Sequence, residues 1–162
     1  MPGQSVAPGQ PPGRQPFSTP REHAIDDSQP PTRDTSVHAS CSIVVVDDDL
    51  AFAETLAAFS RLTGCAACVI EPRGLLYAVD RILDLRADLV FLDVALAHLD
   101  GCAVAEALRS RGAAARLIAV TGDCRPETAQ RCRRAGFDEV WHKPIEPARV
   151  EAFLDAFMAR RT

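Results

Sequence analysis

Short apolar runs alternate with stretches of helix-period apolar residues through most of this 162-residue chain. Runs that are apolar at every position predict strands buried on both faces, because neither side of such a strand meets water. The pattern predicts strands near residues 42–47, 66–70, 88–92, 116–120 and 138–141. Helices are expected over about 50–60, 75–83, 101–111, 126–135 and 147–160.

Glycine and proline positions agree with this division. Gly64 and Gly112 follow the first and third predicted helices, where a left-handed cap favours glycine. Pro126 and Pro147 stand at plausible first-turn positions of the fourth and fifth. The alternation predicts an α/β fold, with a doubly wound five-stranded parallel sheet and helices on both faces.

The beginning of the chain has a different composition. Residues 1–40 are rich in Pro, Gly, Gln and Ser and carry few apolar side chains, so we expect a disordered N-terminal tail. The domain is expected over residues 41–160. Because the chain ends about where the fifth helix does, no appended output domain is expected.

Composition excludes several classes of protein. The hydrophobic fraction is 47%, but no apolar run approaches the roughly 18 residues that span a bilayer, and the polar start is unlike a secretory signal. We therefore expect a cytoplasmic protein without membrane contact. A net charge of −4 gives no general attraction to nucleic acid.

Six cysteines are scattered through apolar or helical contexts, unlike the dense framework of a small secreted domain. Cys65 and Cys68 have the spacing of a redox or zinc pair, but no second pair or histidine is near them in the sequence. Reduced, buried thiols are the expected state, and a role of this pair is left open.

Polar residues follow the predicted strands. Asp47 and Asp48 come after the first, Asp93 after the third, Thr121 after the fourth and Lys143 after the fifth. With strand order 2-1-3-4-5, the flavodoxin-like (βα)5 arrangement, the carboxyl ends bring these side chains into one pocket. Crowded carboxylates suit Mg²⁺. The alternative is that loop aspartates are solvated helix caps, as Asp49 is expected to be.

Together these residues resemble the receiver domain of two-component response regulators, over about residues 42–158. The matching pieces are Val46-Asp47-Asp48, Phe91-Leu92-Asp93 leading to Leu99-Asp100-Gly101, Val120-Thr121-Gly122 and Lys143-Pro144.

The resemblance implies phosphorylation of Asp93 by a sensor histidine kinase or a phosphotransfer protein. It also implies Mg²⁺ ligation by Asp48, Asp93 and the backbone carbonyl of Ala95, with Asp47 acting through a metal-bound water. Thr121 and Lys143 would bind the phosphoryl group, and the Lys143-Pro144 bond would be cis.

Several positions depart from the family pattern. Ala97 replaces a proline usual beyond the phosphoacceptor, which frees a backbone dihedral in that loop. Val140 stands where the family often has an aromatic switch residue, so the usual coupling to an output surface is in doubt. Its neighbour Trp141 points to the opposite face of the strand and is expected in the core. Ala95 and Asp123 occupy positions that tune the lifetime of the phosphoryl group in the family.

The leading hypothesis is a stand-alone receiver that signals by docking to a downstream protein, without chemistry beyond phosphoryl transfer to and from its own Asp93. A second reading is a receiver-like phosphate sink or interaction module that does not switch. An aspartyl phosphohydrolase is a weaker third, because Ala95 stands where such enzymes place a second aspartate.

Two further groups of polar residues, arginines and histidines, are not assigned a role in the predicted pocket. The arginines around the fourth helix are interpreted as a solvated helix face or, alternatively, a surface for an acidic partner; they are Arg125, Arg131, Arg133 and Arg134. No DNA-recognition element is found. His98 and His142 are expected at the rim of the pocket rather than as ligands, because Mg²⁺ prefers oxygen.

Overall fold

Five parallel strands form the central sheet, in the spatial order β2-β1-β3-β6-β7. Their bounds are β1 Ser42–Val46, β2 Ala66–Ile70, β3 Leu89–Asp93, β6 Arg116–Thr121 and β7 Glu139–His142. The computed structural model describes residues 41–161. The predicted fold class and strand order are confirmed. The predicted tail at residues 1–40 lies outside the described range, and the domain limits of 41–160 stay a prediction.

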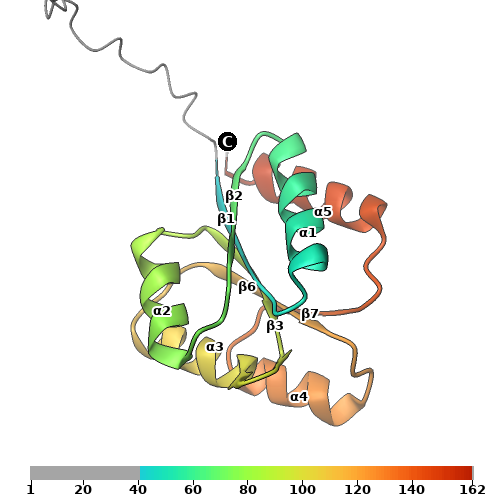
Figure 1. Ribbon diagram of the computed structural model, residues 1–162. Coiled ribbons are helices and arrows are strands. Elements are labelled where there is room, and N and C mark those ends of the chain that lie inside the picture. Colours follow the sequence, from blue (N-terminus) through green and yellow to red (C-terminus); the bar gives the residue numbers. More distant parts are fainter. Residues whose placement is uncertain (1–40, 162) are drawn as a thin grey trace, which may run out of the picture. The chain divides into compact units, whose positions relative to one another are not determined.

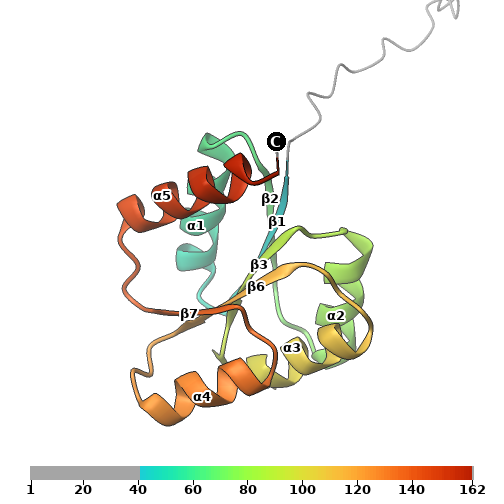
Figure 2. The same ribbon diagram turned by 180° about the vertical axis from the view of Figure 1, so that it is seen from behind.

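Five helices cover the two faces of this sheet. They are α1 Leu50–Leu62, α2 Leu75–Asp84, α3 Gly101–Ser110, α4 Pro126–Arg134 and α5 Pro147–Ala159. Figures 1 and 2 show α1 and α5 together on one face, and α2, α3 and α4 on the other. Within residues 41–161, no helix combines the length and the apolar character needed to cross a membrane.

The helix ends follow local rules. Asp49 caps α1 through its Oδ1 atom, which accepts a hydrogen bond from Phe52 N at 3.1 Å. Proline occupies the first turn of α4 and of α5, as predicted. Beyond α1, Gly64 adopts a φ of 85°, a left-handed conformation that glycine enters without a steric penalty.

Alternating residues of each strand face opposite cores. Ile43 and Val45 of β1 are buried against α1 and α5, while Val44 and Val46 are buried against α2 and α3. Both sides of the central strands are apolar because helices cover both faces. The uninterrupted apolar runs in the sequence are thereby explained.

The same alternation separates neighbouring residues of β7. Trp141 is 1% exposed and packs with Phe91 and Phe153, with ring centroids 5.5 and 5.0 Å away. Val140 contacts the core on the opposite face and is half-buried. The prediction that Trp141 is a core residue is confirmed.

A short hairpin follows β3 and was not predicted. Its strands are β4 Ala95–Leu96 and β5 Leu99–Asp100, which pair in antiparallel register, with Ala95 opposite Asp100. The hairpin connects the end of β3 with the start of α3. It therefore shapes the loop beside Asp93.

Candidate functional site

The carboxyl ends of four strands place the predicted site residues together. Asp47 follows β1, Asp93 is the last residue of β3, Thr121 is the last residue of β6, and Lys143 follows β7. These strands are neighbours in the order β1-β3-β6-β7. Carboxylate oxygens of Asp47, Asp48 and Asp93 all lie within 4.8 Å of one another. The predicted clustering of the three acids is thus observed.

One ammonium group bridges the two buried acids. Lys143 Nζ donates hydrogen bonds to Asp47 Oδ2 at 2.8 Å and to Asp93 Oδ2 at 2.9 Å. The side chains of Asp47 and Asp93 are only 1% and 8% exposed, so their charges need a close partner. Lys143 is the only lysine of the chain.

The other oxygen of each buried acid is bound by the backbone. Asp47 Oδ1 accepts from Asp49 N at 2.9 Å, and Asp93 Oδ1 accepts from Ala95 N at 2.9 Å. Both carboxylates are therefore held at both oxygens. This fixes the direction in which Asp93 presents its remaining lone pairs.

Asp48 is the exposed member of the acidic trio. Its Oδ2 atom accepts a hydrogen bond from Ala97 N at 3.0 Å. A proline at position 97 would have no N–H to donate. The departure at Ala97 thus supplies a bond that links the loop after Asp93 to the loop after β1.

The pKa values of the site reflect burial and the shared ammonium. Burial raises the pKa of the Asp47 carboxyl, and the hydrogen bond from Lys143 only partly opposes this. For Lys143, burial by itself would lower the pKa, but the hydrogen bonds to Asp47 and Asp93 outweigh it and raise the pKa. The site thereby keeps its one ammonium protonated.

The donor set fits a divalent cation. Three carboxylates and one ammonium leave two negative charges in excess when all are ionised. Carboxylate oxygens are the ligands that Mg²⁺ prefers, and it is commonly bound through one or two carboxylates. These acids are the ones that the resemblance to receiver domains assigns to a Mg²⁺ site.

Thr121 is fully buried at the end of β6. Its Oγ1 atom accepts a hydrogen bond from Asp123 N at 3.0 Å, and its carbonyl accepts from Lys143 N at 2.8 Å. The β6 and β7 ends are therefore joined at the site. The Lys143-Pro144 bond is cis, as the resemblance implies.

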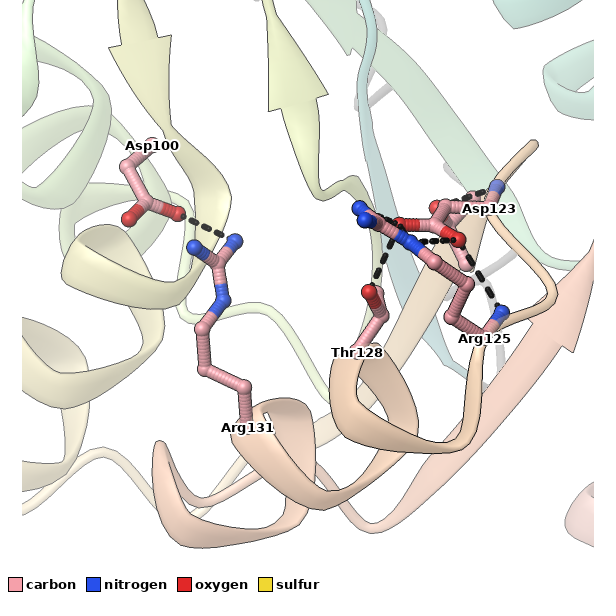
Figure 3. A network of polar contacts seen from close by, with 6 residues as sticks. Asp100, Asp123, Arg125, Thr128 and Arg131 are labelled. Atoms are coloured by element: carbon pink, nitrogen blue, oxygen red, sulfur yellow. Dashed lines mark hydrogen bonds and ion pairs between the residues drawn. The ribbon is translucent and has the colours of Figure 1, made fainter.

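Asp123 is held by two residues of the following turn and helix (Figure 3). Arg125 Nη2 and Thr128 Oγ1 each donate to Asp123 Oδ2 at 2.6 Å. The hydrogen bonds from Arg125 and then Thr128 hold the pKa of this carboxyl well below its usual range. We call these three residues the Asp123 clasp. Sequence reasoning did not find it, because Arg125 was interpreted as part of a solvated helix face or, alternatively, of a surface for an acidic partner.

A second ion pair links the two helices beside the site. Arg131 Nη2 of α4 lies 3.1 Å from Oδ1 of Asp100, the residue that caps α3 (Figure 3). A groove of about 480 Å³ lies beside the Arg131–Asp100 pair and the Asp123 clasp, and Ala95 and Thr121 also line it. The groove is thus continuous with the end of the sheet where Asp93 lies.

Phe52 is a site residue that was not predicted from the sequence. Its ring centroid lies 4.6 Å from Lys143 Nζ, in a cation–π arrangement. The contact fixes one flank of the ammonium. His98 is exposed and His142 is half-buried beside Lys143.

Comparison with known proteins identifies the family. The response regulator receiver domain model matches residues 43–155. Among curated proteins, the chain is 27% identical to the transcriptional regulatory protein ZraR of Escherichia coli (strain K12) and 24% identical to the transcription factor SKN7 of Saccharomyces cerevisiae (strain ATCC 204508 / S288c). The matches cover 75% and 74% of this chain but only 27% and 19% of those proteins.

Solved structures show the same fold. A CheY-like response regulator receiver domain protein from Methanospirillum hungatei JF-1 matches with a TM-score of 0.66 and 20% identity, over 75% of this chain and 95% of that one. The chemotaxis protein CheY4 of Vibrio cholerae matches with a TM-score of 0.63 and 19% identity, over 72% and 97%. Family model, topology and acidic pocket agree, so this chain belongs to the response regulator receiver domain family.

Proposed function

We propose that this protein is a stand-alone, cytoplasmic receiver, phosphorylated on Asp93 by a sensor histidine kinase or a phosphotransfer protein. Its output would be docking to a downstream protein. The observation that carries the proposal is the position of Lys143 Nζ, 2.8 Å from Asp47 and 2.9 Å from Asp93. An ammonium shared by two buried carboxylates is placed to meet the charge of an incoming phosphoryl group.

Asp93 supplies the nucleophile. A carboxylate oxygen attacks phosphorus in line, a P–O bond to Asp93 forms, and the P–N bond to the donor histidine breaks. No general base is needed, because a carboxylate carries no proton that must be removed. Receiver domains transfer the phosphoryl group only to and from their own aspartate, so this chain is not a classical enzyme.

Lys143 and Thr121 would bind the transferred group. Lys143 Nζ would neutralise charge on the phosphoryl oxygens from its position beside Asp93. The Thr121 hydroxyl accepts its bond from Asp123 N, so its own hydrogen can be donated to a phosphoryl oxygen. Both residues would then respond to phosphorylation at the ends of β6 and β7.

Asp47, Asp48, Asp93 and the backbone carbonyl of Ala95 would hold Mg²⁺. When bound, Mg²⁺ would supply positive charge that offsets the charge of the phosphoryl group. Asp48 is the one exposed acid of the three, and its carboxylate accepts a hydrogen bond from Ala97 N.

Phosphorylation can be tested with acetyl phosphate and Mg²⁺, followed by intact-mass measurement. The wild type should gain one acid-labile phosphoryl group, and the Asp93→Asn variant should gain none. Asp84→Asn, which alters an exposed carboxylate at the end of α2, should behave as the wild type. If the wild type gains no phosphoryl group, the proposal fails.

Val140 favours a second candidate function, in which the receiver accepts a phosphoryl group but its output surface does not change conformation. This half-buried aliphatic side chain packs against the core on the α2–α4 face and has no polar tip that could move with Thr121. Amide chemical shifts with beryllofluoride separate the two cases. Shifts confined to the pocket would indicate a sink, while shifts reaching α4, β7 and α5 would indicate a switch.

A further inference from the structure

Two cysteines face each other at the amino-terminal edge of the sheet. Cys41 precedes β1 and Cys65 precedes β2, and their Sγ atoms lie 2.7 Å apart. The strands pair in parallel register from Ser42 opposite Ala66, and Ala66 N donates to the Cys41 carbonyl at 2.9 Å. The two cysteines are therefore cross-strand neighbours, one residue before the ladder begins.

The side chains of Cys41 and Cys65 lie in the same hydrophobic core. Cys41 is 2% and Cys65 is 5% exposed, and both pack in the cluster beneath α1 and α5. Cys68 instead packs against the opposite core, because it is three residues from Cys65 along the strand. The Cys65–Cys68 spacing seen in the sequence is thus not a spatial pair. The sulfur nearest to Cys65 Sγ is that of Cys41, and Met158 Sδ lies 3.4 Å away.

The sulfur separation is short for a contact without a bond. Carbon atoms that touch without bonding lie about 3.5–4.0 Å apart, while a disulfide bond is about 2.05 Å long. Adjacent strands lie about 4.8 Å apart, within the roughly 4.4–6.8 Å that disulfides span between Cα atoms. The backbone at this edge is already spaced for a cross-link.

We propose that Cys41 and Cys65 form a reversible disulfide when a small hydroperoxide oxidises the protein. One peroxide oxygen is first transferred to the Cys65 sulfur, which gives a sulfenic acid, while the other oxygen leaves as water or an alcohol. The Cys41 sulfur then attacks the Cys65 sulfur and displaces the transferred oxygen as water. Overall, two thiols and one hydroperoxide give one disulfide, one water and the reduced oxidant (water or an alcohol), and both thiol protons leave in these products.

The environment assigns the two roles. Cys41 is the more deeply buried thiol, at 2% exposed, and burial is the first cause that raises its pKa, so it is the less accessible of the two to an oxidant. Cys65 is the more exposed of the two, although both are buried. A small oxidant is required, because neither sulfur offers room for a bulky disulfide reagent.

The cross-link would act at the edge of the sheet opposite the acidic pocket. It would close a chain segment that contains β1, the loop with Asp47 and Asp48, and all of α1. Such a closure restricts the unfolded chain, so the oxidised protein should unfold at a temperature higher by on the order of 10 °C. The phosphoryl-transfer residues themselves are untouched.

The test uses the full chain carrying Cys124→Ala, which removes an exposed thiol that peroxide would oxidise independently. After treatment with hydrogen peroxide and denaturation, alkylation should find two fewer thiols than in the reduced protein. Peptide mapping should connect Cys41 with Cys65, and dithiothreitol should restore both thiols and the original unfolding temperature.

Matched variants in the same background make the assignment. Cys41→Ala and Cys65→Ala should each abolish the cross-link and the rise in unfolding temperature. Cys102→Ala should keep both, although Cys102 also has a cysteine neighbour, Cys132, at 4.0 Å. A cross-link that joins any other pair, or no loss of thiols, would overturn the proposal. The proposal would also fail if a metal chelator restored the two missing thiols to alkylation, because this would show that the sulfurs bind a soft metal ion instead of each other.

Discussion

A Cβ atom built on Gly101 would lie 2.1 Å from the carbonyl oxygen of Asp93. The first residue of α3 and the last residue of β3 therefore touch through their backbones, and Gly101 N donates to the Val94 carbonyl at 3.1 Å. Glycine is required here by close approach. The position of Asp93 thus depends on a residue that carries no functional group.

Gly101→Ala should lower the free energy of unfolding by about 1–3 kcal/mol, because backbone must shift to admit the methyl group. Gly122→Ala is the control, since a Cβ there meets nothing within 4 Å. Urea unfolding of both variants measures the difference. Equal small effects would show that the contact at Gly101 is not restrictive.

Lys143→Ala should destabilise the protein by about 2 kcal/mol near neutral pH, because buried Asp47 and Asp93 lose their shared ammonium. Mg²⁺ should restore part of this loss by supplying positive charge in its place. Arg73→Ala removes an ion pair to Glu71 whose side chains are 66% and 62% exposed, and should change stability by less than about 0.5 kcal/mol. Similar losses in the two variants would contradict the proposed importance of the buried bridge.

Arg125→Ala should shorten the phosphoryl lifetime several-fold. Without Arg125, only Thr128 of the clasp still holds the Asp123 carboxylate, which is then freer to orient a water molecule toward phosphorus. The rate of phosphoryl loss after acetyl phosphate is removed gives the measurement. In an Asp123→Ala background the same substitution should have no effect, and Arg133→Ala should leave the lifetime unchanged. A full effect of Arg125→Ala in both backgrounds would show that it acts independently of Asp123.

Cys132 should make stability fall as the pH rises above about 9. Burial raises the pKa of this thiol from 9.0 to about 12, so the folded state keeps a proton that the unfolded state has lost. Over this interval the native state binds more protons, and unfolding becomes easier by up to about 1.4 kcal/mol per pH unit. Urea unfolding across this range should therefore show a shallower pH dependence for Cys132→Ala than for the wild type. Cys124→Ala alters an exposed thiol and should keep the wild-type slope.

Most of the fold was predictable because a strand that is buried on both faces is apolar at every position, and such a run is easily recognised in the sequence. The run Ile43 to Val46 can be apolar throughout only under two layers of helices. The hairpin of β4 and β5 could not be predicted in this way, since each strand has two residues and only Leu96 among the four is buried. Periodicity needs longer segments than these.

Those site residues were predictable whose place depends only on their position at the end of a strand. Asp47, Asp93, Thr121 and Lys143 follow from the rule that parallel strands bring their carboxyl ends together. Contacts between side chains were not predictable: the Asp123 clasp depends on the turn into α4, and the Cys41–Cys65 contact depends on strand register. Cys65 and Cys68, whose role the sequence left open, are not neighbours in space, because Cys68 lies on the other face of the strand.

The presence of one lysine in the chain makes the site accessible to selective isotope labelling. Reductive methylation with labelled formaldehyde would tag only the Lys143 amine and the chain's terminal amine. The labelled methyl groups of Lys143 would then lie near the Phe52 ring, and the ring current would change their chemical shift. A single spectral line would thereby follow the ammonium as ligands enter the pocket.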